Sequence, residues 1–121
     1  MNSEVLKMKA VERQHEWTKH LKFFSEQNAG RPTRLGVFEP SSGVAADYWI
    51  ECGLPLFGVD MDIRGDAIGV QIKIGSLTHE TKNVVKLSFQ LTASGEEDGL
   101  DVLDADGRLT VLRFETNRDR D

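Results

Sequence analysis

Apolar and polar residues alternate along most of the second half of the chain. From Phe57 to Ile63 the apolar side chains occupy every second position, and Asp60 and Asp62 lie between them. Residues 70–74 and 85–91 repeat the pattern. A period of two residues places all the apolar side chains on one face of a β-strand. The pattern therefore predicts a sheet with one buried and one solvated face, with Phe57 on the buried face.

Turn-forming residues divide this region into short strands. We expect strands over residues 33–39, 48–52, 57–63, 67–74, 78–82, 84–92, 100–103 and 109–115. Gly53 and Pro55 separate the second of these from the third, and residues 64–66 close a hairpin. Short connectors without helices require antiparallel pairing, largely as a meander. Residues 109–115 carry apolar side chains on both faces, which favours a central strand or the closing strand of a barrel.

One amphipathic helix is predicted before the strands, over residues 14–29. Its apolar stripe is formed by Trp17, Leu21, Phe24 and Asn28. Gly30 and Pro32 are suited to ending the helix. Residues 1–13 have no clear period, which leaves a short strand, a helical lead-in and a frayed arm open. The charged residues 116–121 predict a disordered tail.

The predicted fold class is α+β: one N-terminal helix packed on an antiparallel sheet or open barrel of six to eight strands. A chain of 121 residues, 39% of them hydrophobic, can close one core, so we expect a single domain over residues 1–121. No run approaches the roughly 18 to 20 apolar residues that cross a bilayer, and the N-terminus lacks a secretory signal. The single cysteine, Cys52, excludes an internal disulfide and fits a reducing compartment. We therefore expect a cytoplasmic protein without membrane contact, in which Cys52 is a small buried residue.

The net charge of −5 is unevenly distributed along the chain. Residues 1–34 carry seven basic and four acidic side chains (+3), and residues 35–121 carry eight basic and sixteen acidic ones (−8). An acidic sheet repels phosphates, so nucleic acid is not an expected partner. The asymmetry is also compatible with pairing between subunits, although solvation of both faces is the preferred explanation.

Several fragments, taken in their order and spacing, resemble the bacterial domain-of-unknown-function family 5335. The fragments are Glu16-Trp17, residues 23–28 with Gly30, residues 53–60, residues 77–79, residues 97–100, residues 106–108 and residues 112–114. The likeness covers roughly residues 13–115. Members of that family often carry a proline just before the tryptophan segment, where this chain has Val11 to His15. The resemblance implies a small soluble bacterial protein and no particular reaction.

The densest polar cluster lies in the first hairpin, where Asp60 and Asp62 project from one face and Arg64 follows. Paired carboxylates support acid–base chemistry only when one is desolvated. We expect a solvated face with Arg64 neutralising the two carboxylates. His79 is the residue best placed to titrate near neutral pH. A small-ligand-binding or hydrolytic domain that uses Asp60, Arg64 and His79 is therefore the alternative functional hypothesis.

Four aspartates near two turns are candidate ligands for a calcium ion, namely Asp98, Asp101, Asp104 and Asp106. A calcium loop needs six to eight converging oxygens, and Arg108 stands where another oxygen is wanted. Turn chemistry explains these aspartates better. His15 and His20 are five residues apart and point about 140° apart on a helix, so they do not share a metal. No metal and no cofactor are predicted.

The adjacent aromatic residues Tyr48 and Trp49 must point to opposite faces of an extended strand, so one of them lies outside. We expect this pair to mark an interface. No nucleophile with a supporting base is visible, and neither is a phosphate-binding loop. The sequence thus predicts a noncatalytic protein–protein interaction or accessory domain, with self-association through a sheet edge or the Tyr48/Trp49 region. Candidate binding residues are Tyr48, Trp49, Asp60, Asp62, Arg64 and His79.

Overall fold

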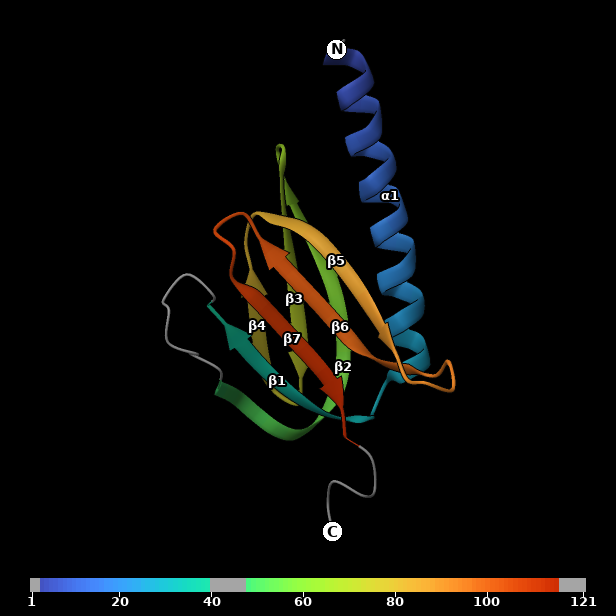
Figure 1. Ribbon diagram of the computed structural model, residues 1–121, viewed down its shortest axis with the longest axis vertical. Coiled ribbons are helices and arrows are strands. Elements are labelled where there is room, and N and C mark those ends of the chain that lie inside the picture. The colour runs from blue at the N-terminus through green and yellow to red at the C-terminus, as the bar shows by residue number, and fades with distance from the viewer. Residues whose placement is uncertain (1–2, 40–47, 116–121) are drawn as a thin grey trace.

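The computed structural model describes the backbone of residues 3–39 and 48–115, and the side chains of residues 14–39 and 51–115. Its elements follow in the order α1 (Ser3–Asn28), β1 (Pro32–Phe38), β2 (Tyr48–Arg64), β3 (Ala67–Ile74), β4 (Leu77–Thr81), β5 (Val84–Leu91), β6 (Glu97–Asp104) and β7 (Leu109–Phe114). The helix and the strands lie side by side in Figure 1. The predicted α+β class with an N-terminal helix is confirmed.

All seven strands of the described chain belong to one antiparallel sheet in the order β4-β3-β2-β1-β7-β6-β5. Two meanders, β1 to β4 and β5 to β7, join where β7 pairs with β1 along residues 109–114 and 33–38. The expected central position of the last strand is therefore confirmed. β2 is long because its first half pairs with β1 and its second half, from Leu56, pairs with β3.

The sheet must curl because its two edge strands are neighbours in sequence. β4 and β5 lie at opposite ends of the strand order, yet only Lys82 and Asn83 connect them. Two residues span at most roughly 7 Å beyond the strand ends, so the edges meet there and the sheet forms a half-barrel. Asn83 turns the chain with a φ of 55°, a conformation that asparagine tolerates.

The C-terminal half of helix α1 covers the open side of this half-barrel, and its N-terminal half extends beyond the strands (Figure 1). Beyond Leu56, β2 pairs with β3 on one side only, and its other edge faces the helix. Ser25 joins the two elements: its Oγ accepts the Val59 N–H at 2.8 Å and donates to the Leu21 carbonyl at 2.7 Å. Phe24 enters the core, where its ring centroid lies 5.6 Å from those of both Phe89 and Phe114.

The core lies between the inner face of the curled sheet and the apolar stripe of the helix. Its buried members include Leu21, Leu35, Ile72, Leu100 and Leu112. Trp17 packs against this cluster, while Asn28 is buried at the end of the stripe. The helical stripe predicted from spacing is therefore the one that packs.

Two positions differ from the predicted alternation because of β-bulges. Phe57 has no partner in the β2–β3 ladder, since Leu56 pairs with Ile74 and Gly58 with Lys73. The extra residue reverses the alternation, so Leu56 is buried and Phe57 is 74% exposed. Val85 is bulged out of β5 in the same way and is exposed. The prediction that Phe57 lines the core was wrong.

Further corrections concern the limits of elements and one side chain. Gly53 and Pro55 do not separate two strands: both lie within β2, near the point where it passes from β1 to β3. The open question about the N-terminus is resolved for residues 3–13, which continue the helix. Cys52 is exposed, contrary to the expected burial. The predicted tail over residues 116–121 lies outside the described residues.

Candidate functional site

An open apolar groove lies between α1 and the far end of edge strand β5. It has a volume of about 500 Å³. The helix contributes Lys19, His20, Lys22, Phe23, Phe24 and Glu26, and the strands contribute Phe89, Gln90, Leu91, Glu97 and Gly99. Phe23 is 58% exposed and Leu91 is 61% exposed. Two large apolar side chains that remain wet on either side of one groove are typical of a binding surface.

The aromatic residues at the base of the groove contact one another. Phe24 holds Phe89 through ring contact, and the His20 ring packs edge-on to Phe89 at a centroid distance of 5.7 Å. Phe24 and Phe23 are adjacent on the helix, so burial of one directs the other outward. The core contact of Phe24 thereby places Phe23 at the rim.

The end of the groove is closed by a polar network at the C-terminus of α1. Asn28 Nδ2 donates to Glu97 Oε2 and, at 2.8 Å, to the Phe24 carbonyl. Arg31 donates to Asn28 Oδ1 at 2.7 Å and to the Glu97 carbonyl at 3.1 Å. The Arg31 guanidinium also lies 4.1 Å from the centre of the Phe114 ring, a favourable cation–π distance. These contacts fix the helix to the start of β6 and the end of β7.

The charges at the rim are arranged along the helix. Lys19 and Lys22 lie one turn apart toward the N-terminal side, and Glu26 follows toward the C-terminal side. Neither lysine forms an ion pair within the described part of the chain, whereas Lys73, Arg108 and other cations do. The basic end of the groove therefore has unused positive charge next to apolar surface.

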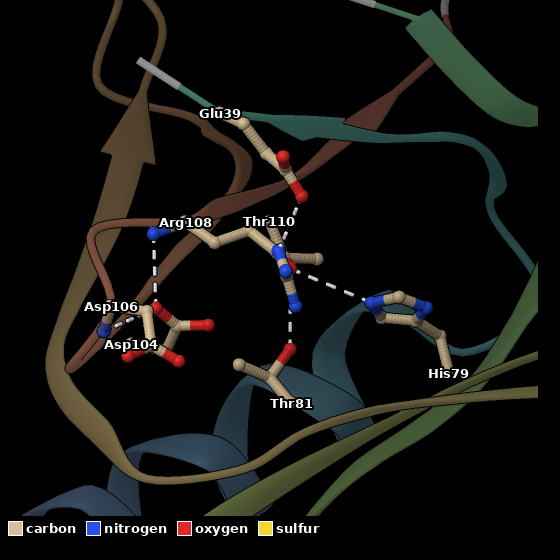
Figure 2. Close-up of polar contacts among 7 residues, drawn as sticks. All are labelled: Glu39, His79, Thr81, Asp104, Asp106, Arg108 and Thr110. Carbon is tan, nitrogen blue, oxygen red and sulfur yellow. Dashed lines mark hydrogen bonds and ion pairs between the residues drawn. The ribbon is translucent and has the colours of Figure 1, made fainter. Parts of the chain in front are cut away.

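A second cavity, of about 320 Å³ and mostly polar, lies where β4 meets the β6–β7 turn (Figure 2). The Thr81 and Thr110 hydroxyls are 3.2 Å apart, and His79 Nε2 is 3.5 Å from Thr110 Oγ1. Arg108 donates through Nε to Glu39 Oε1 at 2.8 Å. This contact is the main cause that raises the pKa of Arg108 above its ordinary value. Thr110 is only 1% exposed, so its hydroxyl serves to join β4 to β7.

His79 is the predicted site residue that this cavity contains. Burial lowers its pKa below the ordinary histidine value, and the positive charge of Arg108 lowers it further. His79 is therefore neutral at neutral pH. The arrangement is a hydrogen-bonded contact between two strands, because the hydroxyl beside the imidazole is buried and already bonded to Thr81.

The alternative set Asp60, Arg64 and His79 does not converge. His79 pairs with Ile72, and Ile72 pairs with the buried Val59, so His79 belongs to the inner face. Asp60 pairs with Gln71 on the opposite face of the same sheet. Asp60 forms a 3.0 Å ion pair with Lys73. These three residues therefore cannot act on one substrate atom.

The carboxylates singled out from the sequence have local partners. Arg64 Nε lies 3.0 Å from Asp62 Oδ2, which confirms the predicted neutralisation for that carboxylate. Asp104 Oδ1 accepts the backbone N–H groups of Asp106 and Arg108, each at 2.9 Å, which confirms turn chemistry there. Asp101 forms a 2.7 Å ion pair with Arg113. Within the described residues no group of three or more histidine, cysteine, aspartate or glutamate side chains could hold a metal ion.

Tyr48 and Trp49 lie at the start of β2, but their side chains are outside the described set. Sequence reasoning did not identify the groove. Its one available signal was the adjacent pair Phe23 and Phe24, because only one of two neighbouring aromatics can follow the buried stripe. The alternation predicts Leu91 on the buried face, which is wrong, because Leu91 is 61% exposed.

Comparisons with protein-family models, with curated proteins and with solved structures found no match to this chain. The resemblance to family 5335 therefore stays a prediction. In the described part of the chain no helix is long and apolar enough to cross a membrane.

Proposed function

We propose that the chain is a noncatalytic interaction protein that binds a protein partner in the groove between α1 and β5. The observation that carries this proposal is the exposure of Phe23 and Leu91 on facing walls of one apolar groove. Full burial of each such side chain by a partner contributes about 1.5–3 kcal/mol. A few buried aromatic and aliphatic anchors typically supply most of the binding energy of an interface.

The polar side chains predicted as site residues already form contacts within the chain, which supports a noncatalytic role. The hydroxyl nearest His79 is buried and bonded to Thr81, and the carboxylates of Asp60 and Asp62 form ion pairs on the outer face. General acid–base catalysis requires a titrating group within reach of an accessible substrate atom. The single exposed cysteine and the absence of a membrane-spanning helix in the described residues agree with a cytoplasmic location, which is part of the proposal.

Affinity purification of three tagged forms from the native host tests the proposal: the unchanged chain, Phe23→Ser and Phe57→Ser. Phe57 is a matched control because it is also highly exposed but does not line the groove. We expect proteins that co-purify with the unchanged chain and with Phe57→Ser to fall about tenfold or more with Phe23→Ser, as loss of a buried anchor predicts. Equal recovery with all three forms would contradict the proposal.

Light scattering after size-exclusion chromatography separates a foreign partner from a second copy. Self-association that disappears with Phe23→Ser and persists with Phe57→Ser assigns the groove to a copy of this chain. A monomer at high concentration, combined with Phe23-dependent capture of another protein, assigns it to a foreign partner. Thermal unfolding of each variant provides the folding control, because exposed positions away from the core change stability by only about 0.5 kcal/mol.

A further inference from the structure

We infer that protonation of His79 in mildly acidic solution releases β4 from β7 and opens the polar cavity between them, while the rest of the sheet stays folded. The inference concerns the cavity at the end of β4 and is independent of the groove and of the proposed partner. Three observations carry it: β4 is a short edge strand, side chains join it to β7 across the inside of the sheet, and the imidazole lies within this contact beside a positive charge.

Strand β4 is held by a backbone ladder on one side only. It has five residues, Leu77–Thr81, and pairs with β3 over residues 70–74. Strands β3, β2 and β1 lie between β4 and β7 in the sheet, so β4 and β7 meet across its curled inner face and not as ladder neighbours. Segments with few backbone contacts open without global unfolding. β4 can therefore leave its place while β1 and β7 remain paired.

The contact between β4 and β7 is centred on one hydroxyl group (Figure 2). Thr110 Oγ1 lies 3.2 Å from Thr81 Oγ1 and 3.5 Å from His79 Nε2. Both threonines are buried, with exposed fractions of 1% for Thr110 and 5% for Thr81. A neutral imidazole can accept a hydrogen bond from Thr110 through Nε2, whereas a protonated imidazole can only donate. The two hydroxyls can follow this reversal by rotating, so the force that opens the contact must come from the added charge.

A positive charge on His79 is unfavourable in the closed contact. Burial disfavours the charged imidazole and lowers the pKa of His79, and the guanidinium of Arg108 lowers it further. Arg108 is held near the cavity because its Nε donates to Glu39 Oε1 at 2.8 Å. Water stabilises the protonated imidazole when β4 leaves the contact, and distance from Arg108 weakens the repulsion. Protonation therefore favours the open position of β4 over the closed one.

The carboxylates around the cavity do not neutralise a protonated His79. Asp104 Oδ1 is occupied by two backbone N–H groups, each at 2.9 Å. Glu80 pairs with Gln71 and so belongs to the outer face, and the residue opposite His79 on β3 is the apolar Ile72. In residues 14–39 and 51–115 no carboxylate forms an ion pair with His79. The charged residues that line the cavity are Glu80, Lys82, Asp104, Asp106 and Arg108.

Amide hydrogen exchange, followed by NMR on the full chain at low urea concentrations, tests the inference. Exchange through local opening is insensitive to urea, whereas exchange through global unfolding follows the urea slope of the whole protein. We expect the urea-insensitive opening of residues 77–81 to increase by as much as about tenfold between about pH 7.5 and 5.5, the factor that one proton gives when the open state titrates near pH 6.5. Amides between β1 and β7 should open at least about tenfold less often and with the urea slope of global unfolding.

Three variants separate His79 from other causes of an acid response. His79→Gln retains a hydrogen-bonding side chain without a titrating charge and should remove the pH dependence of opening. Arg108→Gln should raise the pKa of His79 in an NMR titration of its ring and weaken the response, whereas His15→Gln, at an exposed position on the helix, should leave it unchanged.

Two results would overturn the inference. The first is an acid response at residues 77–81 that is absent from the unchanged chain or is equally large in His79→Gln, which would exclude His79 as the trigger. The second is exchange at residues 77–81 with the same rate and urea slope as the amides between β1 and β7, which would show that β4 opens only when the whole chain unfolds.

Discussion

Gly99 is the position where the addition of one methyl group should reveal how closely β6 and β7 approach. A Cβ built on Gly99 would lie 1.9 Å from the Leu112 carbonyl oxygen and 3.1 Å from Arg113 Cα. Both contacts are with backbone, which cannot rotate away as a side chain does. The matched control is Gly58, where the nearest atoms to an added Cβ are those of Ser25 at 3.9 Å, an ordinary van der Waals separation.

The cost of Gly99→Ala follows from the separation that must be restored. The strands must open by more than about 1 Å to reach normal contact, which is overpacking and costs about 1–3 kcal/mol. Opening the ladder where Gly99 lies opposite Arg113 adds about 1 kcal/mol for each backbone hydrogen bond that is lost. Reduced freedom of the unfolded chain offsets about 0.4–1 kcal/mol in both alanine variants. We therefore expect Gly99→Ala to lower the free energy of unfolding by about 2–3 kcal/mol and Gly58→Ala to raise it by about 0.4–1 kcal/mol.

Urea unfolding followed by tryptophan fluorescence measures both values, with the slope against urea as a check on two-state behaviour. For 121 residues an unfolding entropy of about 0.25 kcal/mol/K predicts a fall in Tm of about 10 °C for Gly99→Ala. Equal midpoints for the two alanine variants would show that β6 and β7 do not approach closely at Gly99, and would refute the reasoning.

Two further predictions concern the polar cavity between β4 and β7. Thr110→Val should lower the free energy of unfolding by about 1–2 kcal/mol, because it leaves the buried Thr81 hydroxyl without its 3.2 Å partner. The double variant Thr81→Val/Thr110→Val should recover part of that loss in chemical denaturation. A double variant that is less stable than Thr110→Val would refute the hydrogen bond between the two hydroxyls. The lowered pKa of His79 means that the unfolded chain binds a proton more readily than the folded chain, so the free energy of unfolding should fall as the pH drops below about 6.5. His79→Gln should flatten the dependence of Tm on pH in melts between about pH 7 and 5.5. An unchanged pH dependence in this variant would exclude His79 as the cause.

The elements that the sequence predicts well are those governed by local periodicity. The stripe through Leu21, Phe24 and Asn28 depends only on helical geometry, and all three side chains are buried. Ile72 likewise follows the two-residue period of an unbulged strand and is fully buried. Turn chemistry at Asp104 is also local, since its carboxylate accepts two N–H groups from within four residues.

The elements that it predicts poorly depend on contacts between distant segments. The bulge at Phe57 is adjacent to Val59, whose N–H is bonded to Ser25 of the helix 34 residues away. The alternation of apolar and polar residues contains no information about that contact. It therefore predicts a two-residue period through Phe57, where the bulge interrupts the strand. Gly53 and Pro55 carry turn signals, but pairing with two different neighbours keeps β2 continuous across them. The exposed faces of Phe23 and Leu91 depend on the gap between α1 and β5, which no local pattern encodes.

The same two-residue connector that curls the sheet also accounts for the position of the groove. Lys82 and Asn83 hold the end of β4 against the start of β5, and the two edges form no ladder with each other. From this junction β5 runs toward the C-terminal half of α1 (Figure 1). The helix fills the opening with Leu21 and Phe24, whose side chains reach the core. Residues 89–91 lie at the end of β5 farthest from the junction, where one helix does not close the opening, and the apolar groove is the part of the half-barrel that remains uncovered.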